Sequence, residues 1–228
     1  MTLIDAIIRT KRKTIAIIVQ TDGKVVVRAP LKANKKQIEA FVASKVEWIE
    51  KHRQRMQIIA IKGSQKKFVS GEKFLFLGAS YPLEFYDQLA QDFVLVNGFF
   101  QMKRALQPAA LMIFTSWYQV KARQIITERV NWFARRYNFK PVKIRISSAR
   151  TRWGSCSSQG TLSFTWRLIM APVEMIDYVV VHELAHLLER NHGSNFWNEV
   201  EKILPDYKEK RAWLKENGHL LSLEASSQ

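Results

Sequence analysis

The chain has 228 residues, 47% of them apolar, and 36 Lys and Arg against 20 Asp and Glu give it a formal net charge of +16. That apolar content suffices for a packed core, which excludes a disordered chain, and no apolar run reaches the roughly 18 residues of a membrane span. The single cysteine, Cys156, excludes an internal disulfide and fits a reducing compartment, so we expect a cytoplasmic protein without membrane contacts.

The positive charge bears on possible partners. A surface this basic attracts anions, including nucleic acids, nucleotides and anionic lipid head groups. An ordinary soluble protein with dispersed lysines would have the same composition. The sequence alone shows no clustering on one face, so nucleic-acid binding through the basic surface is one of two interpretations.

The first half of the chain reads as a small β-rich module. Residues 14–28 hold two β-branched runs around Asp22-Gly23, and an Asp-Gly pair between such runs is a strong hairpin signal. Residues 34–55 have apolar residues at helical spacing with Asn34 as the expected N-cap, and residues 68–100 return to strand-like runs. We therefore predict an antiparallel β module with one helix.

Pro108 marks the expected domain boundary, because a long helical periodicity runs from Ala109 to Tyr137 just after it. We therefore expect an α+β protein with a basic β-rich module over residues 1–107 and a second domain over residues 108–228. The polar face of the long helix is either a solvated surface or an anion-binding one. Its cations are Lys121, Arg123, Arg129, Arg135 and Arg136.

Two strands are expected on either side of a T-R-W-G-S-C motif. Residues 142–147 alternate apolar and basic side chains, as a half-exposed strand does, and residues 161–166 form the next strand. In the loop between them we interpret Trp153 as packing on the helix that follows and Gly154 as allowing a tight turn. We expect Cys156 to be a buried thiol.

An H-E-x-x-H motif is the strongest feature of residues 178–193. Its two histidines, His182 and His186, are four residues apart, so on a helix both imidazoles can face one ion. The segment is apolar nearly all round, which predicts a buried helix whose polar side chains need partners. Metal ligation supplies those partners in one step, and a hydrogen-bonded structural cluster is the alternative.

His192 is the expected third metal ligand. It follows the expected helix end, where Asn191 and Gly193 tolerate the backbone reversal that would bring it back to the metal. Three protein ligands leave a fourth position open, as in catalytic zinc sites, and Glu183 could take a proton from water there. We expect one zinc ion per chain, although histidine ligands also suit nickel, cobalt, manganese and iron.

Two further helices are expected at the C-terminal end. The first begins at Ser194 or Asn195, and its Phe196-Trp197 pair is interpreted as core. The second begins at Pro205-Asp206 and ends near Asn217-Gly218.

The order of T-R-W-G-S-C, H-E-L-A-H, N-H-G-S-N-F-W and P-D-Y-K resembles the YgjP-like family of bacterial metal-dependent hydrolases, relatives of the SprT-like zincin metalloproteases. The resemblance extends over nearly the whole chain. It implies a minimal zincin-like protease fold of the gluzincin type in the second domain, one zinc ion and a cytosolic protein. It also implies that His182, His186 and His192 are the zinc ligands and that Glu183 is the catalytic base.

The chain departs from the metzincins in two ways. The spacing from His186 to His192 is the metzincin spacing, but Glu189 stands where metzincins have glycine. The last methionine is Met175, so no Met-turn follows the motif. We therefore do not expect a true metzincin.

Four further residues are candidates for substrate binding. Arg150 and Arg152 form a basic pair in a loop expected near the metal, where they could hold a substrate anion or stabilise an oxyanion. Tyr178 and Tyr207 carry hydroxyl groups that could assist a transition state. The sequence does not rank these four residues.

Two enzymatic functions fit these residues. The first is a zinc peptidase whose substrate adds a strand to residues 142–147 or 161–166 and whose activated water attacks the peptide carbonyl. The second hydrolyses the phosphoanhydride of a nucleotide triphosphate at the same site, with Arg150 and Arg152 on the phosphates. A non-enzymatic nucleic-acid-binding protein is a weaker alternative, since it leaves Glu183 unexplained.

Overall fold

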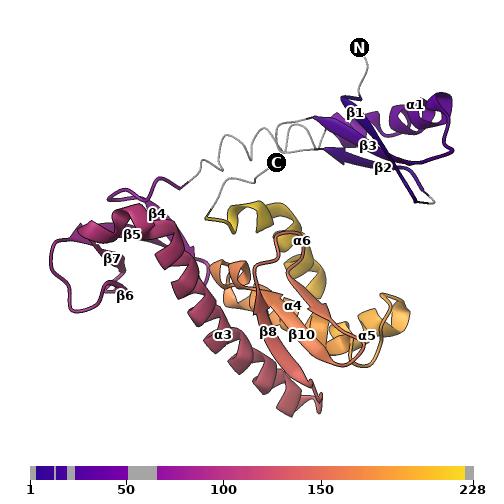
Figure 1. Cartoon of the computed structure of the whole chain (residues 1–228). Coiled ribbons are helices and arrows are strands. Elements are labelled where there is room, and N and C mark those ends of the chain that lie inside the picture. The colour runs from indigo at the N-terminus through magenta and orange to yellow at the C-terminus, as the bar shows by residue number, and fades with distance from the viewer. Residues whose placement is uncertain (1–3, 13, 20–23, 51–65, 224–228) are drawn as a thin grey trace. The chain divides into compact units, whose positions relative to one another are not determined.

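The computed structural model describes residues 4–12, 14–19, 24–50 and 66–223 (Figure 1). The chain forms two compact units that divide between Gln65 and Lys66. Both units combine helices with sheets, so the α+β class is confirmed. Among the described helices, none has both the length and the apolar character that a membrane span requires.

The N-terminal unit contains a three-stranded sheet of β1 (Ala6–Thr10), β2 (Ala16–Val19) and β3 (Val25–Pro30), in the order β1-β3-β2. Strands β2 and β3 pair antiparallel, as the predicted hairpin requires, although the turn at Asp22-Gly23 lies outside the described residues. Strand β1 pairs parallel with β3. The prediction of an antiparallel module is therefore wrong for this strand.

Helix α1 (Lys35–Ala43) covers the small core of this unit. Its N-cap is Asn34 as predicted, because the Asn34 side chain accepts from the Gln37 N–H at 2.8 Å and the Gln37 side chain accepts from the Asn34 N–H at 3.1 Å. The helix ends earlier than predicted, with a turn before a second helical stretch at residues 46–50; residues 51–55 lie outside the described ranges. The core consists of Val25, Val27, Ala29, Ile38, Val42 and Ile49.

The second unit begins with a four-stranded sheet in the order β4-β5-β7-β6. The strands are β4 (Lys73–Phe76), β5 (Ala79–Tyr86), β6 (Phe93–Val96) and β7 (Phe99–Lys103). Both hairpin turns in this sheet have two residues with positive φ, and the second is the expected Asn97-Gly98 turn, with φ values of 50° and 82°. Strands β5 and β7 pair parallel, so this sheet is mixed as well.

The long helix α3 (Ala110–Arg136) packs against this sheet through aromatic side chains. The ring of Phe114 lies 4.2 Å from that of Phe74 and 4.5 Å from that of Phe93, and the Tyr118 hydroxyl donates to the Leu75 carbonyl at 2.6 Å. Such ring pairs and buried hydrogen bonds make one continuous core. Residues 66–107 therefore belong to the same unit as α3.

The expected boundary between residues 107 and 108 is consequently displaced to residues 65 and 66. Besides the packing of α3 on the four-stranded sheet, a second contact joins residues 66–107 to the rest of this unit. The turn between β4 and β5 docks just before the motif helix, where the Leu77 N–H donates to the Ile169 carbonyl at 2.9 Å and the Gly78 N–H to the Met170 carbonyl at 3.1 Å. The composition change at Pro108 marks the start of a helix inside a unit and not the start of a unit.

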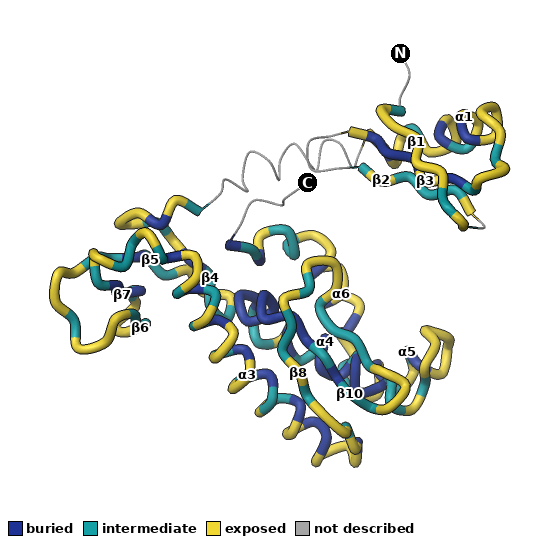
Figure 2. Tube along the Cα trace, viewed as in Figure 1, coloured by how far each residue is buried: buried dark blue, intermediate teal, exposed yellow. Residues whose placement is uncertain are grey.

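The remainder of the second unit carries the H-E-x-x-H motif. Its three-stranded sheet has the order β8-β10-β9, with β8 parallel and β9 antiparallel to the central β10. Helix α4 contains the motif and is buried over most of its length, whereas α3 is buried along one side only (Figure 2). The elements are β8 (Lys143–Ser147), β9 (Gly154–Cys156), β10 (Thr161–Thr165), α4 (Val173–Ala185), α5 (Ser194–Ile203) and α6 (Tyr207–Asn217).

Candidate metal centre

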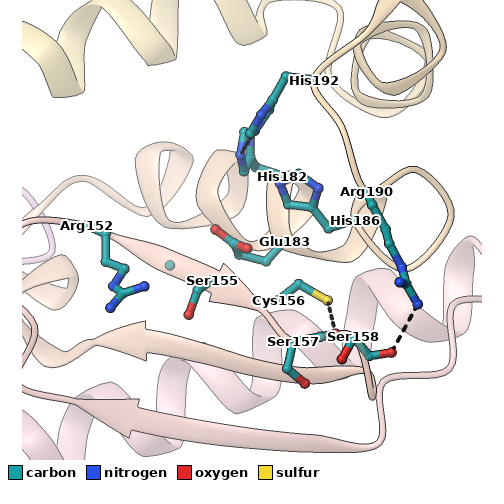
Figure 3. A pocket seen from close by; sticks show the side chains of 11 residues that line it. Arg152, Ser155, Cys156, Ser157, Ser158, His182, Glu183, His186, Arg190 and His192 are labelled. Carbon is teal, nitrogen blue, oxygen red and sulfur yellow. Dashed lines mark hydrogen bonds between the residues drawn. The ribbon is translucent and has the colours of Figure 1, made fainter. Parts of the chain in front are cut away.

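Three histidines converge at the C-terminal end of α4 (Figure 3). His182 lies in the last turn of the helix, His186 directly follows it, and His192 lies in the loop before α5. One nitrogen from each imidazole lies within 4.8 Å of the other two, and the Nε2 atoms of His182 and His192 are 3.1 Å apart. Two ligands of one zinc ion, each about 2.0–2.1 Å from it, have a similar separation in tetrahedral geometry. The three side chains therefore fit a divalent ion.

Helix α4 ends earlier than expected, and the turn that follows it orients the His186 side chain. The helix was expected to continue to Asn191, but it ends at Ala185, and turns follow. In the first of these turns the Nδ1 of His186 lies 3.0 Å from the Glu189 carbonyl. Because a carbonyl can only accept, Nδ1 carries the hydrogen, and the lone pair on Nε2 is left for a metal.

Trp197 holds the backbone of His192. Its indole N–H donates to the His192 carbonyl at 3.1 Å, and its ring stacks on Tyr207 with a centroid distance of 5.2 Å and an interplanar angle of 13°. Phe196 is fully buried, and its ring lies 4.5–4.9 Å from all three imidazoles. The pair interpreted as core residues thus supports the three-histidine cluster, which the sequence pattern did not indicate.

The surroundings keep the imidazoles of His182 and His192 neutral. Burial, followed by the neighbouring His186 and His192, lowers the pKa of His182 to about 3, and burial also lowers the pKa of His192. Metal ions bind the unprotonated form of histidine. Protons therefore compete little with a metal ion at neutral pH.

Glu183 is enclosed between α4 and β9. It is 4% exposed, and its Oε2 is buried without a hydrogen-bond partner among the described residues. A Cβ at residue 154 would lie 2.5 Å from its Oε1, so the strand backbone passes directly against the carboxyl group. Gly154 is therefore needed for this close approach and not for the tight turn that we predicted, since it lies within β9.

Burial raises the pKa of Glu183 to about 8, against the opposing effect of the nearby Arg152 cation. A carboxyl group whose pKa lies near neutrality is suited to accept a proton and to return it. Glu183 also lies beside the histidines in the same cavity. The role of Glu183 as the catalytic base stays a prediction.

The cavity at the metal centre has a volume of about 370 Å³. Arg152 and Arg190 lie on either side of Glu183 in it (Figure 3), and Glu183 is the only acidic residue in its lining. Arg190 was not expected from the sequence, although it lies in the loop between the second and third histidines. Cys156 also lines the cavity and is half-buried, so the expectation of a buried thiol is wrong.

The four predicted substrate-binding residues are not brought together. Arg152 lines the cavity, whereas Arg150, Tyr178 and Tyr207 do not. The ring of Tyr178 lies 5.9 Å from that of His182 but is 94% buried, and Tyr207 is stacked under Trp197. The two tyrosines therefore pack against the metal centre, and Arg152 is the member of the set that lines its cavity.

Trp153 also has a defined packing position. A Cβ at Gly218 would lie 2.6 Å from its Cζ2 atom, so the indole lies against the chain directly after α6. Trp153 and Gly154 thus contact different parts of the unit, the C-terminal segment and the motif helix. The T-R-W-G-S-C motif connects them, and its last three residues form the edge strand β9.

The raised pKa of Glu183 predicts a pH dependence of stability in the metal-free protein. Its pKa is about 8 in the folded chain against a usual value of 4.5, so the folded state binds more protons between these two pH values. This contribution to stability is complete below about pH 4.5 and is lost as the pH rises through 8. We expect Glu183→Gln to stabilise the metal-free protein relative to wild type at pH 9 and to have little effect at pH 4.5.

Chemical denaturation of both proteins at the two pH values, with a chelator present, measures this difference. Comparing the two proteins cancels the effects of the histidines, which titrate in both. A stability difference that is the same at pH 4.5 and pH 9 would contradict the raised pKa.

The chain is similar to known metallopeptidase domains. A scan against protein families matches residues 13–217 to the YgjP-like family, described as "YgjP-like, metallopeptidase domain". No curated protein matches the chain. Among solved structures, the metallopeptidase zymogen abylysin of Pyrococcus abyssi matches with 26% identity and a TM-score of 0.36, over 40% of this chain and 93% of that one. The zymogen jannalysin of Methanocaldococcus jannaschii matches with 23% identity and a TM-score of 0.37, over 40% and 95%.

Proposed function

The chain belongs to the YgjP-like family of metallopeptidase domains, and on this premise we propose that it is a zinc-dependent peptidase with a zincin-type site in which Glu183 is the general base. Because this family consists of metallopeptidase domains, the chain is a metal-dependent hydrolase. The alternative of a non-enzymatic nucleic-acid-binding protein is therefore set aside. The observation that carries the proposal is the convergence of three imidazoles beside one enclosed carboxyl group. We propose His182, His186 and His192 as the zinc ligands.

Each residue has a definite task in this proposal. When bound, zinc would lower the pKa of water and polarise a carbonyl group. Glu183 accepts the proton of the attacking water and passes it to the leaving amine. Trp197 and the Glu189 carbonyl keep His192 and His186 in their positions.

The sheet topology indicates where a peptide would bind. Strand β10 is central, with β8 and β9 on its two sides, so the expected addition of a strand to residues 161–166 is excluded. Residues 142–147 lie at the β8 edge, whereas the cavity at the metal centre is lined by Gly154, Ser155 and Cys156 of the β9 edge. We therefore place the substrate at the edge of β9.

The hydrogen bonds of β9 leave this edge available. The Trp153 carbonyl accepts from the Thr165 N–H at 2.9 Å, and the Ser157 N–H donates to the Thr161 carbonyl at 2.9 Å. Because peptide groups alternate in direction along an antiparallel strand, those of Gly154 and Cys156 point away from β10. They can pair with an extended peptide whose scissile bond then lies close to Glu183.

The second candidate is hydrolysis of a phosphoanhydride in a nucleotide triphosphate. One observation favours it: the two cations Arg152 and Arg190 line the cavity, and Glu183 is the only acid there. Guanidinium groups bind phosphate oxygens strongly and with defined geometry. The two candidates are separated by incubating the zinc-loaded protein with an unfolded protein and with a panel of nucleotide triphosphates. Cleavage of nucleotides with no cleavage of peptides would overturn the peptidase proposal.

Arg152→Ala should discriminate between the two substrates quantitatively. A charge-assisted bond to phosphate contributes about 1.5–3 kcal/mol, so its loss should slow nucleotide hydrolysis by roughly 10- to 150-fold. A neutral peptide carbonyl offers less to a guanidinium group, so peptide cleavage should fall less. Steady-state rates on both substrates measure this ratio.

Arg150→Ala is the matched control, because Arg150 precedes β9 in the same segment but does not line the cavity. It should leave both rates close to those of wild type. Equal losses from the two variants would show that the segment is structural and that Arg152 has no separate role in binding.

A further inference from the structure

A long segment of the second unit contains no acidic residue. Between Glu128 and Glu174 the chain has 45 residues, nine of them Lys or Arg and none Asp or Glu. This segment alone therefore accounts for more than half of the net charge of +16. The nine cations are Arg129, Arg135, Arg136, Lys140, Lys143, Arg145, Arg150, Arg152 and Arg167.

Three of these cations form what we call the α3-end basic surface: Arg135, Arg136 and Lys140. All three are exposed, and they occupy the last turn of α3 and the loop that follows it. None of them makes an ion pair with any residue that the structure describes. A hollow of about 450 Å³ lies among them, with Arg135 and Lys140 in its lining.

Two aromatic side chains stand beside these cations. Trp132 is 42% exposed and Tyr137 is 39% exposed. The guanidinium group of Arg136 lies 6.0 Å from the ring centroid of each, and that of Arg129 lies 5.2 Å from Trp132. Arg129 is itself fixed by two hydrogen bonds to Asp177, at 2.6 and 2.8 Å. The rings are therefore held in place with part of their surface open to solvent.

We propose that the α3-end basic surface binds single-stranded nucleic acid. The unpaired cations can follow the phosphate backbone, and the exposed rings of Trp132 and Tyr137 can stack on bases. Bases in a duplex are not available for such stacking, so a single strand uses both features of the surface. An acidic peptide would use the cations alone. This binding is separate from the proposed peptidase activity and does not depend on the metal centre.

Fluorescence anisotropy tests the proposal with the full chain and labelled mixed-sequence oligonucleotides of about 15 nucleotides, the upper end of common site sizes. Both DNA and RNA carry the phosphates and bases that this surface would bind, so strands of each are tested separately. The double variant Arg135→Gln, Lys140→Gln should bind about tenfold or more weakly and should show a smaller dependence on salt, by roughly 1.4 in the logarithmic slope. Trp132→Leu should weaken binding by about fivefold or more, since a stacked base is lost.

Lys121→Gln, Arg123→Gln is the charge-matched control, because these cations lie on α3 outside the basic surface. It should weaken binding by less than about threefold. Tyr137→Leu provides a second aromatic variant, and unchanged metal content and circular dichroism show that each variant is folded. The proposal is overturned if the control weakens binding as much as the double variant does, or if both aromatic variants bind like wild type. Equal competition by duplex DNA or by polyglutamate would likewise overturn it.

Discussion

Replacing Glu183 with glutamine should leave the metal bound and remove most of the hydrolytic activity. Glutamine has nearly the same shape, so it fits the space against Gly154, but it cannot accept a proton from water. Loss of a general base typically lowers a rate by about 10² to 10⁴. The measurement is the turnover number on whichever substrate is cleaved, at matched metal content.

Glu189→Gln is the control for this experiment. Its carboxyl group does not line the cavity at the metal centre, although its carbonyl oxygen contacts His186, and the substitution leaves the backbone unchanged. Its activity should stay near that of wild type. Wild-type turnover in a metal-loaded Glu183→Gln protein would exclude Glu183 as the base.

The protein should carry about one divalent metal ion per chain, and His182→Ala or His186→Ala should lose it. Either change removes one of three imidazoles whose nitrogens lie within 4.8 Å of one another. Two remaining protein ligands hold zinc weakly compared with three. Elemental analysis of protein purified without chelator or metal-affinity resin measures the stoichiometry.

His219→Ala is the matched histidine control. His219 lies after α6 and does not belong to the three-histidine cluster. The variant should retain the metal. Full metal content in both His182→Ala and His186→Ala would show that the metal binds elsewhere.

Local sequence signals predicted the elements that depend only on neighbouring residues. The capping residues Asn34 and Gln37 and the turn Asn97-Gly98 set the backbone through contacts a few residues long, and they are found as expected. The H-E-x-x-H spacing likewise predicted that His182 and His186 lie on one side of the chain, and they do so at the C-terminal end of α4. The physical cause of such local structure lies in the neighbouring residues themselves, so it can be predicted without knowing the rest of the fold.

Features that depend on distant contacts were missed or misplaced. Strand β9 has three residues and exists because β10 pairs with it, so nothing in T-R-W-G-S-C marked it as a strand. The close approach of Gly154 to Glu183 joins residues 29 positions apart, and a glycine in a loop-like motif suggests a turn first. Arg152 and Arg150 look alike in sequence, and their different positions relative to the cavity appear only in the fold.

The docking of the β4–β5 turn before α4 has a practical consequence for recombinant fragments. A fragment cut at Pro108 would leave the aromatic face of α3, including Phe114 and Tyr118, open to solvent. It would also lack Leu77 and Gly78, whose backbone N–H groups donate hydrogen bonds to the segment that leads into α4. Such a fragment should precipitate on expression even though it contains every histidine of the metal centre. A clone intended for crystallisation of this half should instead begin at Lys66.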